Sequence, residues 1–115
     1  MNISSTSLPW PKPEYCQLEN GTHCVFTQMV EASLICIDFW CKAGSFFEQP
    51  GEEGLAHFLE HMVFKGSRNL RAGEFDHKIE ALGGSSNAAT GFDDVHFYVL
   101  VPPKSLEKAL NLLIN

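Results

Sequence analysis

The spacing of apolar residues changes period along this 115-residue chain, and the change limits the folds open to it. Ser33–Lys42 carries apolar side chains at every second position, which is typical of a strand with one buried face. Gly54–Lys65 and Gly73–Leu82 repeat them at three- and four-residue spacing, which predicts amphipathic helices. A chain that alternates between the two periods favours a sheet with helices packed on it.

The order of these segments indicates the fold class. Two further strands are predicted at Ser86–Thr90 and Val95–Val101, and a last helix at Lys104–Asn115. Strands, two helices, two strands and a helix, in that order, predict an α+β domain with a largely antiparallel sheet covered by helices. We expect residues 1–14 to form an irregular leader and residues 15–115 to form the domain.

The dipeptide Asn20-Gly21 separates two short runs, Tyr15–Glu19 and Thr22–Phe26. Asn-Gly between such runs is a strong signal for a β-hairpin. We expect a type I′ turn here, with positive φ at both residues.

Charge and composition exclude several classes of protein. The formal net charge is −6 and the chain has no basic run, which argues against binding to nucleic acid. The longest apolar run, Val95–Val101, is too short to span a membrane. The amino end resembles neither a secretory signal nor a mitochondrial import sequence. Without a signal or a paired spacing, the four cysteines are expected to be reduced and mostly buried, in a cytoplasmic protein.

His57-Phe58-Leu59-Glu60-His61 is the motif that carries chemistry. On a helix, residues i and i+4 lie about 5–6 Å apart, so two imidazoles can point at one ion. A catalytic zinc uses three protein ligands and one open position for water. Glu60 lies beside this pair and can act as general base on such a water. Chance predicts on the order of 0.015 such pentapeptides in a chain of this composition.

The residues around the motif resemble a known family. Gly44, Gly54–Ser67 and the segment Gly83–Thr90 with Tyr98 are similar to the zinc-site and Asn-Ala-x-Thr segments of pitrilysin/insulinase metallopeptidases. These are inverzincins, named for the H-x-x-E-H order. Leu18–Gly21 matches the first hairpin of that family, so the resemblance covers about residues 15–115.

The resemblance implies a function and its residues. The protein would be a zinc metalloendopeptidase with one Zn²⁺, held by His57 and His61, and with Glu60 as catalytic base. Asn87 and Ala88 would belong to a strand that pairs with the backbone of an extended peptide or unfolded protein segment.

The resemblance also implies parts that this chain lacks. In the family, a Glu on a helix beyond the equivalent of residue 115 is the third zinc ligand, and a second homologous half completes the site. We therefore expect this sequence to be an amino-terminal fragment, interrupted within its last helix. Several residues of ligand type lie within the chain, but helix-terminus, turn or packing roles explain them better: Glu48, Glu52, Glu53, Asp93, Asp94 and His96. His23 is expected in the hairpin and His77 on a helix surface.

Three interpretations remain open. The chain is the zinc-binding part of a peptidase, or a non-catalytic fragment or structural partner subunit of the same fold, or a truncated chain without function. The intact HxxEH residues favour the first interpretation for the parent protein.

Overall fold

The computed structural model describes residues 10–114. The chain divides into two compact units, residues 1–32 and residues 33–115, and each is described by itself. Residues 10–13 have no regular secondary structure. The remainder of the predicted leader, residues 1–9, lies outside the described residues, as does Asn115.

The first unit contains a hairpin of two antiparallel strands, β1 (Glu14–Gln17) and β2 (His23–Phe26). Its turn differs from the prediction. Only Gly21 has a positive φ, +87°, and its N–H donates to the carbonyl oxygen of Leu18, so a type I′ turn is wrong. The Leu18 N–H donates to the carbonyl oxygen of Thr22, and the geometry is that of a three-residue loop with glycine at its left-handed position.

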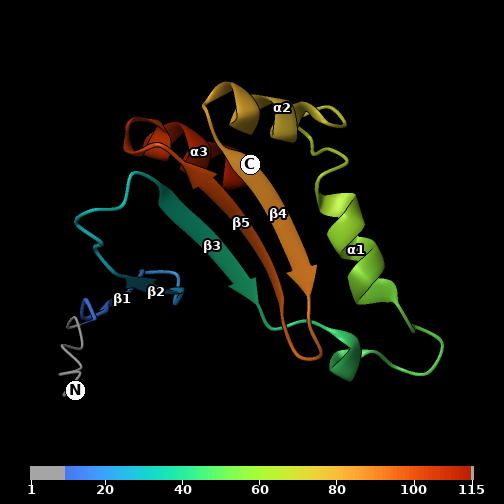
Figure 1. Cartoon of the computed structure of the whole chain (residues 1–115). Helices are drawn as coiled ribbons and strands as arrows, with labels where there is room; N and C mark the ends of the chain where they lie inside the picture. The colour runs from blue at the N-terminus through green and yellow to red at the C-terminus, as the bar shows by residue number, and fades with distance from the viewer. Residues whose placement is uncertain (1–9, 115) are drawn as a thin grey trace, which may run out of the picture. The chain divides into compact units, whose positions relative to one another are not determined.

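The second unit is a three-stranded antiparallel sheet in the order β3-β5-β4, with three α-helices (Figure 1). The strands are β3 (Ile35–Cys41), β4 (Ser85–Thr90) and β5 (Val95–Val101). The helices are α1 (Leu55–Val63), α2 (Glu74–Ala81) and α3 (Leu106–Leu113), with short 3₁₀ turns at Ser45–Phe47 and Pro103–Ser105. The predicted α+β class is confirmed, and each predicted helix ends at least one residue earlier than expected.

The core lies where α2 and α3 pack on β5. Ile79, Val99, Val101 and Ala109 are fully buried, and Phe75 is 8% exposed. Burying a Val, Ile or Phe side chain stabilises a fold by about 1.5–3 kcal/mol. Gly84 permits the close approach, because a Cβ there would lie 2.4 Å from the carbonyl oxygen of Leu100.

Several residues that the sequence pattern predicted to be buried are exposed or half-buried. The predicted burial of the cysteines is wrong: all four are free thiols, with Cys16 and Cys36 exposed and Cys24 and Cys41 half-buried. Phe39, on the predicted apolar face of β3, is 52% exposed. No helix in residues 10–114 has the length and apolar character needed to cross a lipid bilayer.

Candidate metal centre and peptide groove

Helix α1 carries both histidines of the motif one turn apart. The Nε2 atoms of His57 and His61 lie 3.1 Å from each other, and both side chains are exposed. Two imidazole nitrogens on a tetrahedral zinc, each at about 2.0–2.1 Å, are about 3.3 Å apart. The pair therefore fits two positions of a zinc ligand set with little rearrangement.

The start of α1 is held by a glutamate from the preceding loop. The two carboxylate oxygens of Glu48 accept hydrogen bonds from the backbone N–H groups of Gly54 and Ala56, each at 2.8 Å. These N–H groups belong to the first turn, where a helix leaves its donors unsatisfied and its dipole favours an anion. Glu48 thus anchors the helix that carries the histidines.

Glu60 of α1 points toward the sheet. It is half-buried, and its carboxylate accepts a hydrogen bond from the hydroxyl of Thr90 on β4. An ionised carboxylate has about four acceptor sites, so one bond to Thr90 leaves Glu60 able to accept a proton. The bond holds the proposed base against the edge strand.

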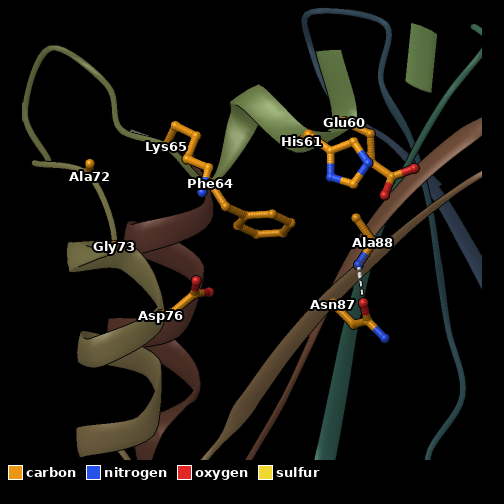
Figure 2. A pocket seen from close by; sticks show the side chains of 9 residues that line it. All are labelled: Glu60, His61, Phe64, Lys65, Ala72, Gly73, Asp76, Asn87 and Ala88. Carbon is orange, nitrogen blue, oxygen red and sulfur yellow. Dashed lines mark hydrogen bonds between the residues drawn. The ribbon is translucent and has the colours of Figure 1, made fainter. Parts of the chain in front are cut away.

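A groove runs between α1 and β4, with a volume of about 570 Å³. Figure 2 shows Glu60 and His61 on one side and Asn87 and Ala88 on the other. The rest of the lining comes from the end of α1, the following loop and α2: Phe64, Lys65, Ala72, Gly73 and Asp76. Four of the five residues singled out by the sequence therefore share one groove, and His57 lies on the next turn of α1.

Strand β4 is at the edge of its sheet, and the backbone of Ala88 faces outward. Gly91 N–H donates to the carbonyl oxygen of Asp94 at 2.7 Å, so this pair closes the β4–β5 hairpin. Hydrogen-bonded and non-hydrogen-bonded pairs alternate in an antiparallel ladder, which makes Ala88–Phe97 a non-hydrogen-bonded pair. The N–H and C=O of Ala88 then point away from β5. The Ala88 N–H bonds instead to the side-chain oxygen of Asn87, at 2.9 Å.

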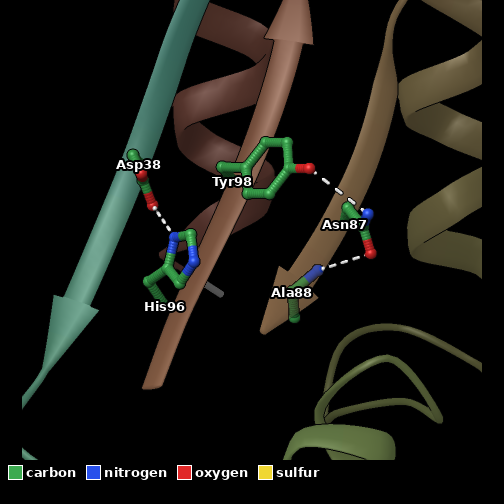
Figure 3. Close-up of polar contacts among 5 residues, drawn as sticks. All are labelled: Asp38, Asn87, Ala88, His96 and Tyr98. Carbon is green, nitrogen blue, oxygen red and sulfur yellow. Dashed lines mark hydrogen bonds and ion pairs between the residues drawn. The ribbon is translucent and has the colours of Figure 1, made fainter. Parts of the chain in front are cut away.

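The face of the sheet that carries Asn87 holds a polar network (Figure 3). Asn87 Nδ2 donates to the hydroxyl of Tyr98 at 3.2 Å, which orients the amide whose oxygen caps Ala88. Farther along, His96 Nδ1 lies 2.9 Å from a carboxylate oxygen of Asp38, and its ring stacks on Trp40 with centroids 4.1 Å apart. His96 was predicted to pack among apolar neighbours; it is packed, but against an aromatic ring and a carboxylate.

The alternative ligand candidates are engaged elsewhere. Glu52 accepts a bond from Gln49 N–H and Glu53 from Gly51 N–H, so both organise the loop before α1. Their predicted place at the helix N-terminus is taken by Glu48. Asp94 closes the turn after β4, and His77 is exposed on α2 as predicted. Within residues 10–114 no group of three His, Cys, Asp or Glu side chains is arranged to hold a metal ion.

Sequence reasoning missed two residues that support the site. Glu48 precedes Gly54 by six positions, outside the spacing of any local capping rule. Thr90 lies thirty residues from Glu60, but it shares a strand face with Ala88, and this period of two was a usable signal.

Comparison with known proteins identifies the family of the chain. The family model described as insulinase, peptidase family M16, matches residues 26–115. The chain therefore belongs to the insulinase (M16) family of peptidases.

Individual relatives give the same result. The chain is 40% identical over 103 residues to a protein named zinc protease PqqE from Helicobacter pylori, covering 89% of this chain and 23% of that one. A crystal structure of a protease from H. pylori superposes with a TM-score of 0.85 at 39% identity, over 90% of this chain and 25% of that one. Pitrilysin superposes with a TM-score of 0.80 at 28% identity, over 90% of this chain and 11% of pitrilysin. The chain spans about a quarter of the length of the first curated relatives.

One relative has a name of another kind. Bovine cytochrome b-c1 complex subunit 1 is 29% identical over 105 residues, covering 91% of this chain and 22% of that protein. A similar sequence thus occurs in a protein that is named for a complex and not for proteolysis.

Proposed function

We propose that this chain is the zinc-binding part of a metalloendopeptidase. The 3.1 Å separation of the His57 and His61 Nε2 atoms carries the proposal, because it matches two imidazoles on one zinc. Glu60, directly before His61 in the sequence, faces the edge strand where a peptide would lie. Membership of a peptidase family supports the same reading.

Glu60 is proposed as the general base and acid. Bound zinc would supply an acidic water and polarise the carbonyl of the scissile bond. The Glu60 carboxylate takes the proton from the water, and it later returns a proton to the leaving amine. Thr90 keeps this carboxylate at the β4 side of α1 in both stages.

An extended peptide is the proposed substrate, in a flexible oligopeptide or an unfolded protein segment. It would pair with the outer edge of β4, where the N–H and C=O of Ala88 face outward. Main-chain pairing depends little on sequence, so side-chain preference would come from the groove beside it. Asn87, which now caps the Ala88 N–H, must release it when a peptide carbonyl takes that place.

A third ligand and a second homologous half complete the proposal. Two histidines leave a zinc ligand set open, and further ligands normally fix the orientation of the imidazoles. By resemblance to the family, a Glu on a later helix of a longer protein would supply the third ligand. The chain's length, about a quarter of its relatives, is consistent with this.

A non-catalytic subunit of the same fold is the alternative. The cytochrome b-c1 relative favours it, and the intact HxxEH residues of this chain favour a peptidase. Tight association with a second polypeptide, without zinc in the complex, would support the subunit.

The test is chelator-sensitive hydrolysis of an unstructured peptide. It is measured on the 115-residue chain with zinc and on a longer polypeptide that contains it. Glu60→Gln should lower the rate of the active species by about 10²-fold or more with unchanged zinc content. Glu80→Gln, on the surface of α2, is the matched control. Hydrolysis that is absent from both polypeptides, or equal in Glu60→Gln and wild type, contradicts the proposal.

A further inference from the structure

Two cysteines face each other across the β1–β2 hairpin. Cys16 on β1 is paired with Cys24 on β2 in the register of the ladder. Cys16 is exposed and Cys24 is half-buried, so a small reagent can reach the pair. Neither residue has a part in the proposed hydrolysis.

The backbone of the hairpin brings the two cysteines within reach of a strained disulfide. The bond from Leu18 N–H to the carbonyl of Thr22 closes the hairpin. By alternation along the ladder, Cys16–Cys24 is a hydrogen-bonded pair, with Cα atoms about 5.5 Å apart. The Cα atoms of disulfide-linked cysteines are usually about 4.4–6.8 Å apart, so this pair is within range. Its Cβ atoms, about 5.5 Å apart in a hydrogen-bonded pair, exceed the usual 3.5–4.5 Å, so a disulfide here would be strained and easily reduced.

The other two cysteines of the chain cannot pair with each other in the folded state. Cys36 and Cys41 lie near the two ends of β3, about 17 Å apart at the rise of an extended strand. The odd number of steps between them also puts their side chains on opposite faces of the sheet. The fold therefore favours a disulfide between Cys16 and Cys24 over one between Cys36 and Cys41.

We propose that Cys16 and Cys24 are a reversible redox site, which forms an intramolecular disulfide by exchange with a small-molecule disulfide such as oxidised glutathione. One cysteine thiolate attacks a sulfur of glutathione disulfide and releases a glutathione thiolate. The second thiolate attacks the mixed disulfide and releases the second glutathione. The cysteines lose two electrons to the glutathione disulfide, and their two protons are taken up by the glutathione released.

The environment of Cys24 affects the rate of thiol–disulfide exchange. Desolvation and the neighbouring Cys16 raise the pKa of the Cys24 thiol. The thiolate is the attacking species, so the exchange should accelerate as the pH rises. In a reducing compartment the pair stays open, and an oxidant closes it.

Closure would stabilise a weak element. A two-stranded hairpin is marginally stable at best in water unless other parts of the protein pack on it. A covalent link between β1 and β2 restricts the open ensemble and resists local opening. The expected consequence is slower proteolysis within residues 14–26 of the oxidised chain.

The experiment uses the full 115-residue chain in mixtures of reduced and oxidised glutathione, followed by alkylation of free thiols and peptide mapping by mass. A Cys16–Cys24 link is expected, with Cys36 and Cys41 alkylated. In denaturant the preference should reverse, because Cys36 and Cys41 are closer in sequence and a shorter loop closes at lower entropic cost. The equilibrium constant for Cys16–Cys24 should fall at least about tenfold on unfolding.

Two variants test whether the folded hairpin favours the Cys16–Cys24 disulfide, or whether the two cysteines link only because they are close in the sequence. Gly21→Val places a β-branched residue at a φ of +87° and should lower the equilibrium constant for Cys16–Cys24 toward the denatured value. Cys36→Ser should leave it unchanged. Glutathione adducts without a Cys16–Cys24 link overturn the proposal. So does a native chain that links Cys36 and Cys41 as readily.

Discussion

Among single residues, the contact between Thr90 and Glu60 links strand β4 to helix α1. A hydroxyl on the edge strand donates to the carboxylate proposed as general base, and both residues are half-buried. Hydrogen bonds to charged groups contribute about 1.5–3 kcal/mol to stability. The contact therefore affects both the fold and the orientation of Glu60.

Thr90→Val should destabilise the chain by about 1–2 kcal/mol, because it removes the hydroxyl and keeps the shape of the side chain. Thr90→Ser keeps the donor and should cost less than the valine variant. Denaturant unfolding measures the difference. Thr27→Val, at an exposed position, is the control. Equal stability of Thr90→Val and wild type would show that the Glu60 contact contributes nothing.

At the scale of elements, α1 depends on its first turn more than on burial. None of its residues is fully buried, and Leu55, Phe58 and Leu59 are each more than half exposed. The two bonds from its N-terminal N–H groups to Glu48 thus have a large share in fixing the helix.

Glu48→Gln should destabilise the chain by about 0.5–2 kcal/mol, because a neutral amide has one acceptor oxygen for two donors and no attraction to the helix dipole. The loss should appear as reduced helical circular dichroism and a lower midpoint of unfolding. Glu31→Gln, an exposed residue of the first unit, is the comparison. An unchanged midpoint would refute the anchoring role.

The first turn of α2 should make stability depend on pH. The Lys78 ammonium 2.8 Å away, with the Arg71 N–H, holds the pKa of Glu74 below its ordinary value of 4.5. Because the pKa of Glu74 is lower in the folded chain than in the unfolded chain, its ionised carboxylate stabilises the fold above pH 4.5. This stabilisation is lost as the pH falls through the pKa of Glu74 in the folded chain. Glu74→Gln should flatten this part of the profile, and high salt should shrink the effect because the pair is exposed. Identical profiles for variant and wild type would contradict it.

The spacing of apolar residues predicted most helices and strands. It did not predict the type of the hairpin turn or the contacts of Glu48 and Thr90. The strands around Ile37 and Val99 and the helix around His57 follow from side-chain spacing. The hairpin turn was mistaken because Asn-Gly serves both a two-residue loop and a three-residue loop with a left-handed glycine. Glu48 lies outside the spacing of local capping rules, and the period of two placed Thr90 on the face of Ala88 without showing that Glu60 would meet it.

At the scale of the whole molecule, the described chain exposes much apolar surface. Phe46, Phe58 and Leu59 are about 60% exposed, and the chain spans about a quarter of the length of its first curated relatives. Large apolar patches on soluble proteins mark interaction sites or promote aggregation. The exposed helix is consistent with a domain that needs further chain or a partner to cover it.

The isolated chain should therefore associate as its concentration rises, and Phe58→Glu should weaken the association. Sedimentation velocity over a range of concentrations measures this. Glu107→Gln, on the polar side of α3, is the control for a change of charge. A chain that stays monomeric at all concentrations contradicts the expectation.

Zinc binding by the 115-residue chain, measured by equilibrium dialysis with metal analysis, shows whether His57 and His61 are metal ligands. Wild type should bind zinc at least about tenfold more tightly than the double variant His57→Ala/His61→Ala. The matched variant His23→Ala/His77→Ala, which removes two histidines outside the site, should bind like wild type. Equal zinc binding by wild type and His57→Ala/His61→Ala would contradict the assignment of these histidines as metal ligands.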